Sequence, residues 1–155
     1  MSDIVPAESS AIQMIDSLCA NEFAVELEGE PLQGVFRVSG LITFKLDTKT
    51  TNALKKVQEP FKMTKMVQRD GNNIFNRWLR ETVKAKDDIV RPKRTIAIIA
   101  VDDGVETRRW TVKGAWITEV AYTDFDSGSF QMVEETITFK YDDIEETWAA
   151  TPNLE

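Results

Sequence analysis

The chain has 155 residues, 42% of them hydrophobic, which is enough for one domain with a hydrophobic core. No apolar run approaches the roughly 20 residues of a membrane-spanning helix, and the first ten residues carry no Lys or Arg, so no secretory signal is expected. Histidine is absent and Cys19 is the single cysteine, which excludes His-dependent catalytic pairs, cysteine zinc sites and an internal disulfide.

The net charge of -7 is unevenly distributed along the chain. Residues 1–36 hold seven acidic and no basic residues, residues 37–94 hold fifteen basic and six acidic ones, and residues 95–155 hold four basic and thirteen acidic ones. The basic middle could bind nucleic acid. The segments could also face each other within one fold, or on neighbouring copies of the chain, where charge sets association and register.

The N-terminal residues predict a short helix. Residues 9–21 favour it, because Ser9 or Ser10 can cap its first turn and apolar residues then recur at helical spacing. Cys19 lies on that apolar stripe, so we expect it to pack in the core.

Two strands and an unusual segment follow. Alternating apolar residues predict strands at 23–28 and 36–46, and Gly40 predicts a bulge or bend in the second. Residues 47–60 are rich in Thr and Lys, hold no aromatic residue and offer no core face. We interpret them as a long loop or an extended hairpin tip, and a loop of this length in a small domain is usually functional.

The middle of the chain predicts a strand at 61–67 and then the clearest helix in the sequence. Asn72 or Asn73 can cap this helix, and an apolar stripe that includes Trp78 follows at helical spacing. A core position for Trp78 is therefore favoured over a role in a nucleic-acid groove.

The C-terminal part predicts a β-hairpin and a closing strand. Residues 96–101 are apolar on both faces, Asp102-Asp103-Gly104 is a hairpin turn signal, and a return strand runs to Tyr122. The last strand, residues 133–141, alternates apolar and polar side chains.

Together these elements predict a mainly β (β+α) fold of six or seven antiparallel strands. It is a small barrel or sandwich with one flanking helix and a short N-terminal helix. One domain is expected over residues 1–155, with an N-terminal extension at 1–21, an extended loop or arm at 47–60 and a loose tail at 149–155.

No catalytic or metal-binding constellation is recognisable, so we expect no enzyme activity and no cofactor. The acidic doublets could in principle supply an acid/base pair or a calcium site. Adjacent residues in a strand point to opposite faces, so a solvated surface is the favoured interpretation. These doublets are Asp102-Asp103, Glu134-Glu135, Asp142-Asp143 and Glu145-Glu146.

Several motifs, taken in order, resemble the tail-tube family of contractile phage tails and extracellular contractile injection systems. They span residues 23–148, most of the chain. The motifs are Phe23-x-Val25-x-Leu27-x-Gly29, Gly34–Leu41 with its Val-Ser-Gly-Leu ending, the helix with Trp78, the strand 96–101 with Asp102-Asp103-Gly104, then Trp110, Gly114-Ala115-Trp116 and the closing Glu135–Phe139.

The resemblance implies a structural role without catalytic residues. The subunits would form hexameric rings that stack into a hollow tube, with sheath, baseplate or hub and tube-terminator proteins as partners and DNA or effector cargo in the lumen. Assembly would take place in the bacterial cytoplasm, and the product would be part of a phage tail or injection particle. The chain could be the repeating tube subunit or an adaptor ring that initiates the tube at the baseplate.

Two sets of residues are candidates for assembly. Lys49, Lys55 and Lys56 lie in the arm and could meet the acidic surface of the next ring. The lumen-facing candidates, chosen from strand parity, are Glu134, Thr136 and Thr138. A different class of function, a stand-alone β-barrel that binds a ligand or nucleic acid, rests on the basic middle segment.

Overall fold

The computed structural model describes residues 18, 22–47, 49, 53–85 and 91–149, and the expected helix at 9–21 lies outside them except for Leu18. Ten strands and one helix occupy the described residues. The strands are β1 (Phe23–Leu27), β2 (Glu30–Pro31), β3 (Val35–Ser39), β4 (Thr43–Asp47), β5 (Ala53–Val57), β6 (Phe61–Met66), β7 (Arg94–Asp102), β8 (Val105–Tyr122), β9 (Glu134–Lys140) and β10 (Asp143–Trp148), and the helix is α2 (Ile74–Ala85).

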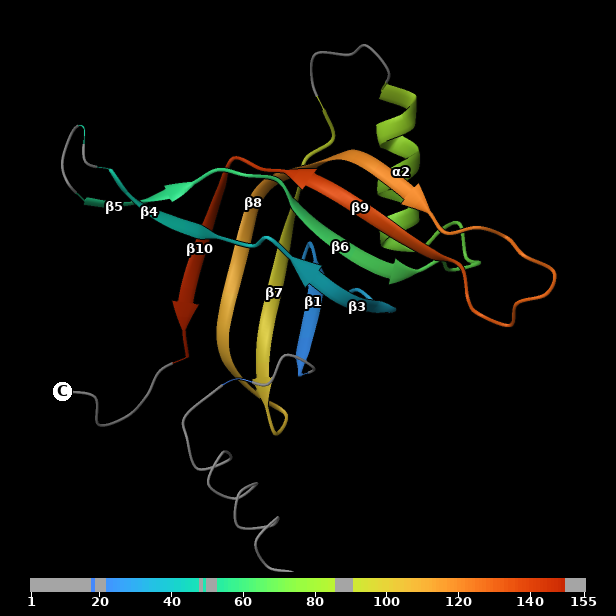
Figure 1. Ribbon diagram of the computed structural model, residues 1–155, viewed down its shortest axis with the longest axis horizontal. Coiled ribbons are helices and arrows are strands. Elements are labelled where there is room, and N and C mark those ends of the chain that lie inside the picture. The colour runs from blue at the N-terminus through green and yellow to red at the C-terminus, as the bar shows by residue number, and fades with distance from the viewer. Residues whose placement is uncertain (1–17, 19–21, 48, 50–52, 86–90, 150–155) are drawn as a thin grey trace, which may run out of the picture.

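Eight of the strands form one antiparallel sheet, in which seven follow the order β2-β1-β7-β8-β9-β6-β3 and β10 also pairs with β8. The 18-residue β8 serves both halves of this sheet, because its first part pairs with β7 and β10 and its last part with β9 (Figure 1). The expected fold class, antiparallel β with a flanking helix, is confirmed.

The strand count differs from the sequence-based expectation of six or seven. The segment 36–46 is two strands, because Gly40 adopts a left-handed φ of 74° and the chain leaves the sheet there. Strand β10 was not predicted, because Ile144 is its one fully buried apolar side chain and acidic residues surround it. Short strands with one buried residue give no detectable alternation.

The hydrophobic core is formed by apolar side chains of the sheet together with Phe75 and Trp78 of α2. Trp78 is buried, its ring stacks on Phe139 at a centroid distance of 5.5 Å, and its indole Nε1 donates to the carbonyl of Pro92 at 2.8 Å. The ring of Phe61 also stacks on Phe139, at a centroid distance of 5.1 Å. The helix begins where expected, since the side-chain oxygen of Asn73 accepts from the backbone N–H of Asn76 at 2.8 Å.

The turn between β7 and β8 has the geometry that its sequence predicted. Asp103 and Gly104 have φ values of 52° and 79°, the two left-handed residues of a type I′ hairpin turn. The acidic doublet Asp102-Asp103 therefore has a backbone role.

Gly114, in the middle of β8, is required by its surroundings. Its φ is 63°, and a Cβ built there would lie 2.0 Å from the Asp142 carboxylate. We expect Gly114→Ala to lower the free energy of unfolding by about 1–3 kcal/mol, because the backbone is strained and Asp142 must move away from Lys93. Urea denaturation measures this, and Gly71→Ala, at a glycine without positive φ, is the matched control. Equal stability of the two variants would contradict the expectation.

Candidate assembly surfaces

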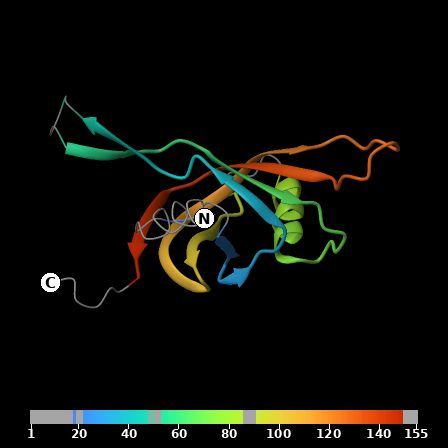
Figure 2. The same ribbon diagram turned by 60° about the horizontal axis from the view of Figure 1, so that its bottom comes forward.

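Strands β4 and β5 form a separate two-stranded arm. Among the described residues they pair only with each other, and they project from one end of the molecule (Figures 1 and 2). Leu46 faces Leu54 across the arm, and both are more than half exposed. Lys45 is in register with Lys55 on the other side of the arm, so two basic side chains are neighbours there.

The base of the arm is tied to β10. The Lys56 ammonium lies 3.0 Å from the Asp143 carboxylate and donates to the carbonyl of Ile144 at 2.6 Å. Gln58 donates to the carbonyl of Asp142 at 2.5 Å. The hydrogen bond from Lys56 holds the pKa of Asp143 below its ordinary value. The Lys56–Asp143 ion pair is therefore fully formed near neutral pH and weakens as the pH falls through that lowered pKa and Asp143 is protonated.

The three lysines proposed for the arm therefore differ in position. Lys56 binds Asp143 at the base of the arm, Lys55 is an exposed residue of β5, and Lys49 lies near the tip of the arm. Strand parity could not show this, because the partner of Lys56 lies 87 positions away in β10.

The outer face of β9 carries the residues that parity selected for the lumen. Thr136 and the Thr64 of β6 share a hydroxyl–hydroxyl hydrogen bond of 3.1 Å, and Thr138 is in register with Lys62. Glu134, Thr136 and Thr138 are each half-buried and alternate with the buried Glu135, Ile137 and Phe139. Lys62 adds a positive charge to this face and the exposed Glu119 of β8, in register with Thr138, adds a negative one, so the face is mixed in charge and not only acidic.

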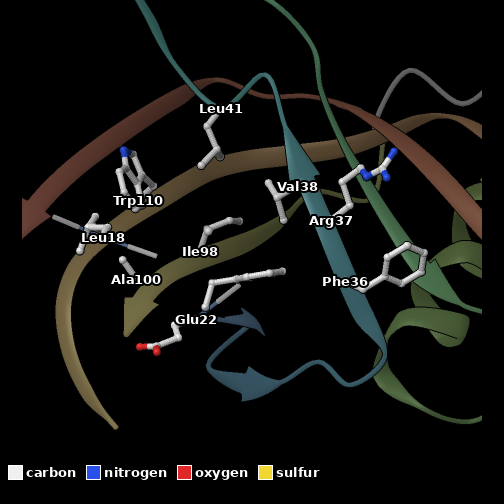
Figure 3. A pocket seen from close by; sticks show the side chains of 10 residues that line it. Leu18, Glu22, Phe36, Arg37, Val38, Leu41, Ile98, Ala100 and Trp110 are labelled. Carbon is white, nitrogen blue, oxygen red and sulfur yellow. The ribbon is translucent and has the colours of Figure 1, made fainter. Parts of the chain in front are cut away.

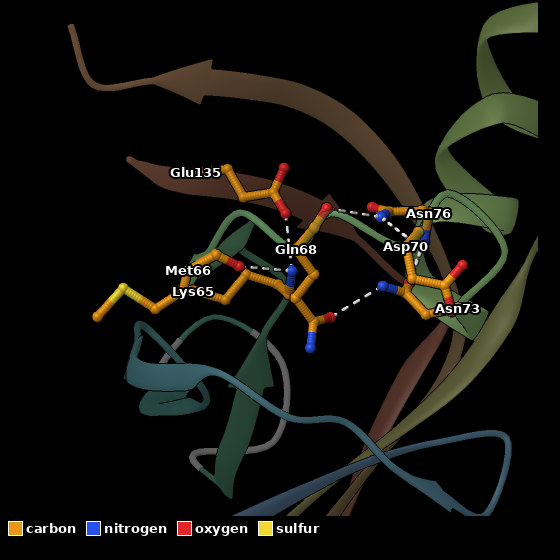
Figure 4. A network of polar contacts seen from close by, with 7 residues as sticks. All are labelled: Lys65, Met66, Gln68, Asp70, Asn73, Asn76 and Glu135. Atoms are coloured by element: carbon orange, nitrogen blue, oxygen red, sulfur yellow. Dashed lines mark hydrogen bonds and ion pairs between the residues drawn. The ribbon is translucent and has the colours of Figure 1, made fainter. Parts of the chain in front are cut away.

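A buried ion pair lies on the other side of the same strands. The Lys65 ammonium is 2.8 Å from the Glu135 carboxylate, and their side chains are 0% and 2% exposed. Lys65 also donates to the carbonyl of Met66 at 2.9 Å (Figure 4). Its ammonium lies 4.9 Å from the centre of the Phe75 ring. Nearby, Gln68 and Asp70 accept hydrogen bonds from the helix-start residues Asn73 and Asn76, which fixes the loop before α2. This pair was not predicted, because the doublet Glu134-Glu135 has the composition of a solvated surface.

Ion pairs join the basic middle segment to the acidic C-terminal segment within one subunit. They are Lys56–Asp143, Lys65–Glu135 and Lys93–Asp142. This supports the interpretation that the segments face each other inside the fold. Two of the three pairs are at the surface, where such pairs contribute about 0–1 kcal/mol to the free energy of unfolding. The charge pattern therefore indicates which segments are neighbours in the fold, and it adds little stability.

The acidic doublets are divided among different partners. Asp142 and Asp143 bind Lys93 and Lys56, and the Glu145 carboxylate lies 2.8 Å from Lys113. Within the described parts of the chain, no cluster of three or more His, Cys, Asp or Glu could hold a metal ion. In the same parts, no helix is long and apolar enough to cross a membrane.

Edges of the sheet remain open within the described structure. β3 pairs only with β6, β10 only with β8, and β2 only with β1. Unpaired strand edges bind further strands readily, so a protein with several of them either protects them or uses them for assembly.

A sequence profile of the T4-like virus tail tube protein gp19 family matches residues 19–145. The chain belongs to this tail tube family. It is therefore a structural subunit of the inner tube of a contractile machine. Comparison with curated proteins found no matching sequence.

Solved structures with the tail tube fold cover nearly the whole chain. A chain of the sheath–tube complex of PVC, an extracellular contractile injection system, is 19% identical, with a TM-score of 0.65 over 91% of this chain and 98% of that one. A chain of the tube-terminating cap of the anti-feeding prophage is 21% identical, with a TM-score of 0.65 over 86% and 92%. Hcp1 from Flavobacterium johnsoniae is 11% identical, with a TM-score of 0.54 over 83% and 96%.

Proposed function

We propose that this chain is the repeating subunit of the tube, and that copies of it form hexameric rings that stack into a hollow conduit. The observation that carries this is the family match over residues 19–145. The open edges of β3 and β10 support it, because pairing between neighbours would satisfy them. An adaptor ring at the baseplate is the alternative, since a similar chain also occurs in the anti-feeding prophage baseplate.

The partners in this proposal are sheath, baseplate and tube-terminator proteins. Similar chains occur in a sheath–tube complex, a sheath/tube terminator and a baseplate. Assembly in the bacterial cytoplasm and passage of DNA or effector cargo belong to the same proposal. The outer face of β9, with Glu134, Thr136 and Thr138, lines the lumen, and Lys62 and Glu119 contribute to it. The subunit itself catalyses no reaction.

Electron microscopy of the purified protein tests the proposal. Rings with six-fold symmetry that stack into tubes are expected, and light scattering should show a mass of six chains or more. A lasting monomer that binds oligonucleotides with a steep salt dependence would instead favour a stand-alone nucleic-acid-binding module.

Charge reversal on the arm tests ring stacking. We expect Lys49→Glu/Lys55→Glu to fold as the wild type does but to stack poorly, because the arm would repel an acidic neighbouring surface. Circular dichroism and micrographs measure folding and stacking. Adding Lys56→Glu should also free the arm from Asp143, so the triple variant should stack no better than the double variant.

The matched control for the arm variants is Arg77→Glu/Lys84→Glu. It changes the net charge by the same amount at exposed positions of α2. It should form tubes. Intact tubes from the arm variants would contradict the role of the arm, and loss of their fold would show that the arm belongs to the core.

A further inference from the structure

The loop between β8 and β9, residues 123–133, carries exposed apolar side chains. Phe130 is fully exposed, Phe125 is 88% exposed and Met132 is 71% exposed. The loop projects from the end of the molecule opposite to the arm (Figures 1 and 2). Exposed apolar side chains concentrated in one place mark an interaction surface.

Local hydrogen bonds give this loop a fixed shape. The Asp126 carboxylate accepts from the backbone N–H of Gly128 at 2.9 Å, and its carbonyl accepts from that of Ser129 at 3.0 Å. Thr123 and Glu134 close the base of the loop with two bonds, at 3.0 and 2.9 Å. The backbone of the loop that carries the two aromatic residues is therefore partly preordered, which lowers the entropy cost of docking it.

A groove in another part of the molecule has the complementary character. Its volume is about 460 Å³, within the range of about 300–1,000 Å³ typical of ligand pockets. Its lining comes from β3, β7, β8 and the residues around β1, and is mainly apolar (Figure 3). The residues that matter here are Phe23, Val38, Leu41, Ile98, Ala100 and Trp110.

The charges of the loop and of the groove rim also match in part. The loop holds Asp124 and Asp126 and no basic residue. Arg37, in β3 beside the groove, is exposed and its side chain points away from Val38 and Ile98, whereas Glu22 lies at the β1 side (Figure 3). An acidic loop that reaches the groove across β3 would pass Arg37 and avoid Glu22.

We propose that Phe125 and Phe130 of one subunit dock in the apolar groove of a second copy of this chain. The inference rests on the proposed self-assembly and assigns one of its contacts. Because the loop and the groove are different surfaces, the contact is heterologous: each copy offers both, and the contact propagates around a ring or along a stack.

Cysteine cross-linking tests which surfaces meet. A Phe130→Cys chain is mixed with a Leu41→Cys chain, both also carrying Cys19→Ser, in a glutathione buffer. We expect the mixture to form at least about tenfold more disulfide-linked dimer than either chain alone, because the two Cα atoms must come within about 7 Å. Val105→Cys, exposed at the far end of β8, replaces Phe130→Cys in the control mixture and should give little dimer.

Loss of the aromatic rings tests their energetic role. Phe125→Ser/Phe130→Ser should keep the thermal midpoint, because both rings are exposed, and should raise the concentration needed for assembly by about tenfold or more. Sedimentation at a series of concentrations measures this.

Three results would overturn the contact. The first is unchanged assembly of the serine variant, and the second is absence of the Leu41–Phe130 cross-link in assembled material. The third is protection of the Leu41→Cys thiol in monomers, which would mean that the chain fills its own groove. A wild-type protein that stays monomeric at every concentration would instead refute the proposed self-assembly.

Discussion

Glu135→Gln is expected to lower the free energy of unfolding by roughly 3–5 kcal/mol, the usual cost of breaking a buried ion pair at one partner. The substitution keeps the shape of the side chain but leaves the Lys65 ammonium without its counter-charge. Lys65 is 0% exposed and Glu135 is 2% exposed, so water cannot replace the lost partner. Urea denaturation followed by circular dichroism gives the free energy, with the slope compared between variants.

The control for this prediction removes both charges. Lys65→Met/Glu135→Leu should recover most of the lost stability, because replacing a buried pair with apolar side chains is often neutral or stabilising. A Glu135→Gln variant that unfolds like the wild type would show that water or another group reaches Lys65.

Trp78→Ala is expected to cost roughly 3–5 kcal/mol, the range for removing a large buried aromatic side chain. The indole is 1% exposed, stacks on Phe139 and donates to the carbonyl of Pro92, so the variant leaves a cavity and an unpaired carbonyl. Denaturation followed by circular dichroism measures the loss.

Trp148→Ala is the matched control. Trp148 is 62% exposed and lies 4.9 Å from the Arg108 guanidinium, so its loss should cost less than about 1 kcal/mol, in keeping with an exposed cation–π contact. Similar losses in the two variants would mean that Trp78 does not anchor the helix.

The local elements could be predicted where side-chain periodicity or turn chemistry is strong. The apolar stripe and the Asn cap predicted α2, and Asp103-Gly104 predicted the hairpin between β7 and β8. The family could be recognised because those elements occur in a characteristic order. Gly40 was interpreted as a bulge or bend within one strand, whereas β3 ends just before it and a separate strand, β4, begins at Thr43.

Long-range features of the surfaces could not be predicted in this way. Glu135 has the parity of Ile137, but an acidic side chain in a doublet gives no sign of a buried lysine partner 70 positions away. Lys56 lies in a segment whose composition is typical of an exposed arm. Its contact with Asp143 depends on how the arm meets β10. The exposed Phe125 and Phe130 lie in a loop without helical or strand periodicity, so their exposure could not be predicted.

The 18-residue strand β8 has a mechanical consequence for a tube wall. Because one continuous backbone runs through both halves of the sheet, a shear applied at the β10 side is transmitted to β9 through covalent bonds and ladder hydrogen bonds. The two halves are less able to hinge independently than separately connected sheets are, so we expect the subunit to open as one cooperative unit. A conduit built from such subunits would resist a change in cross-section when it is driven lengthwise.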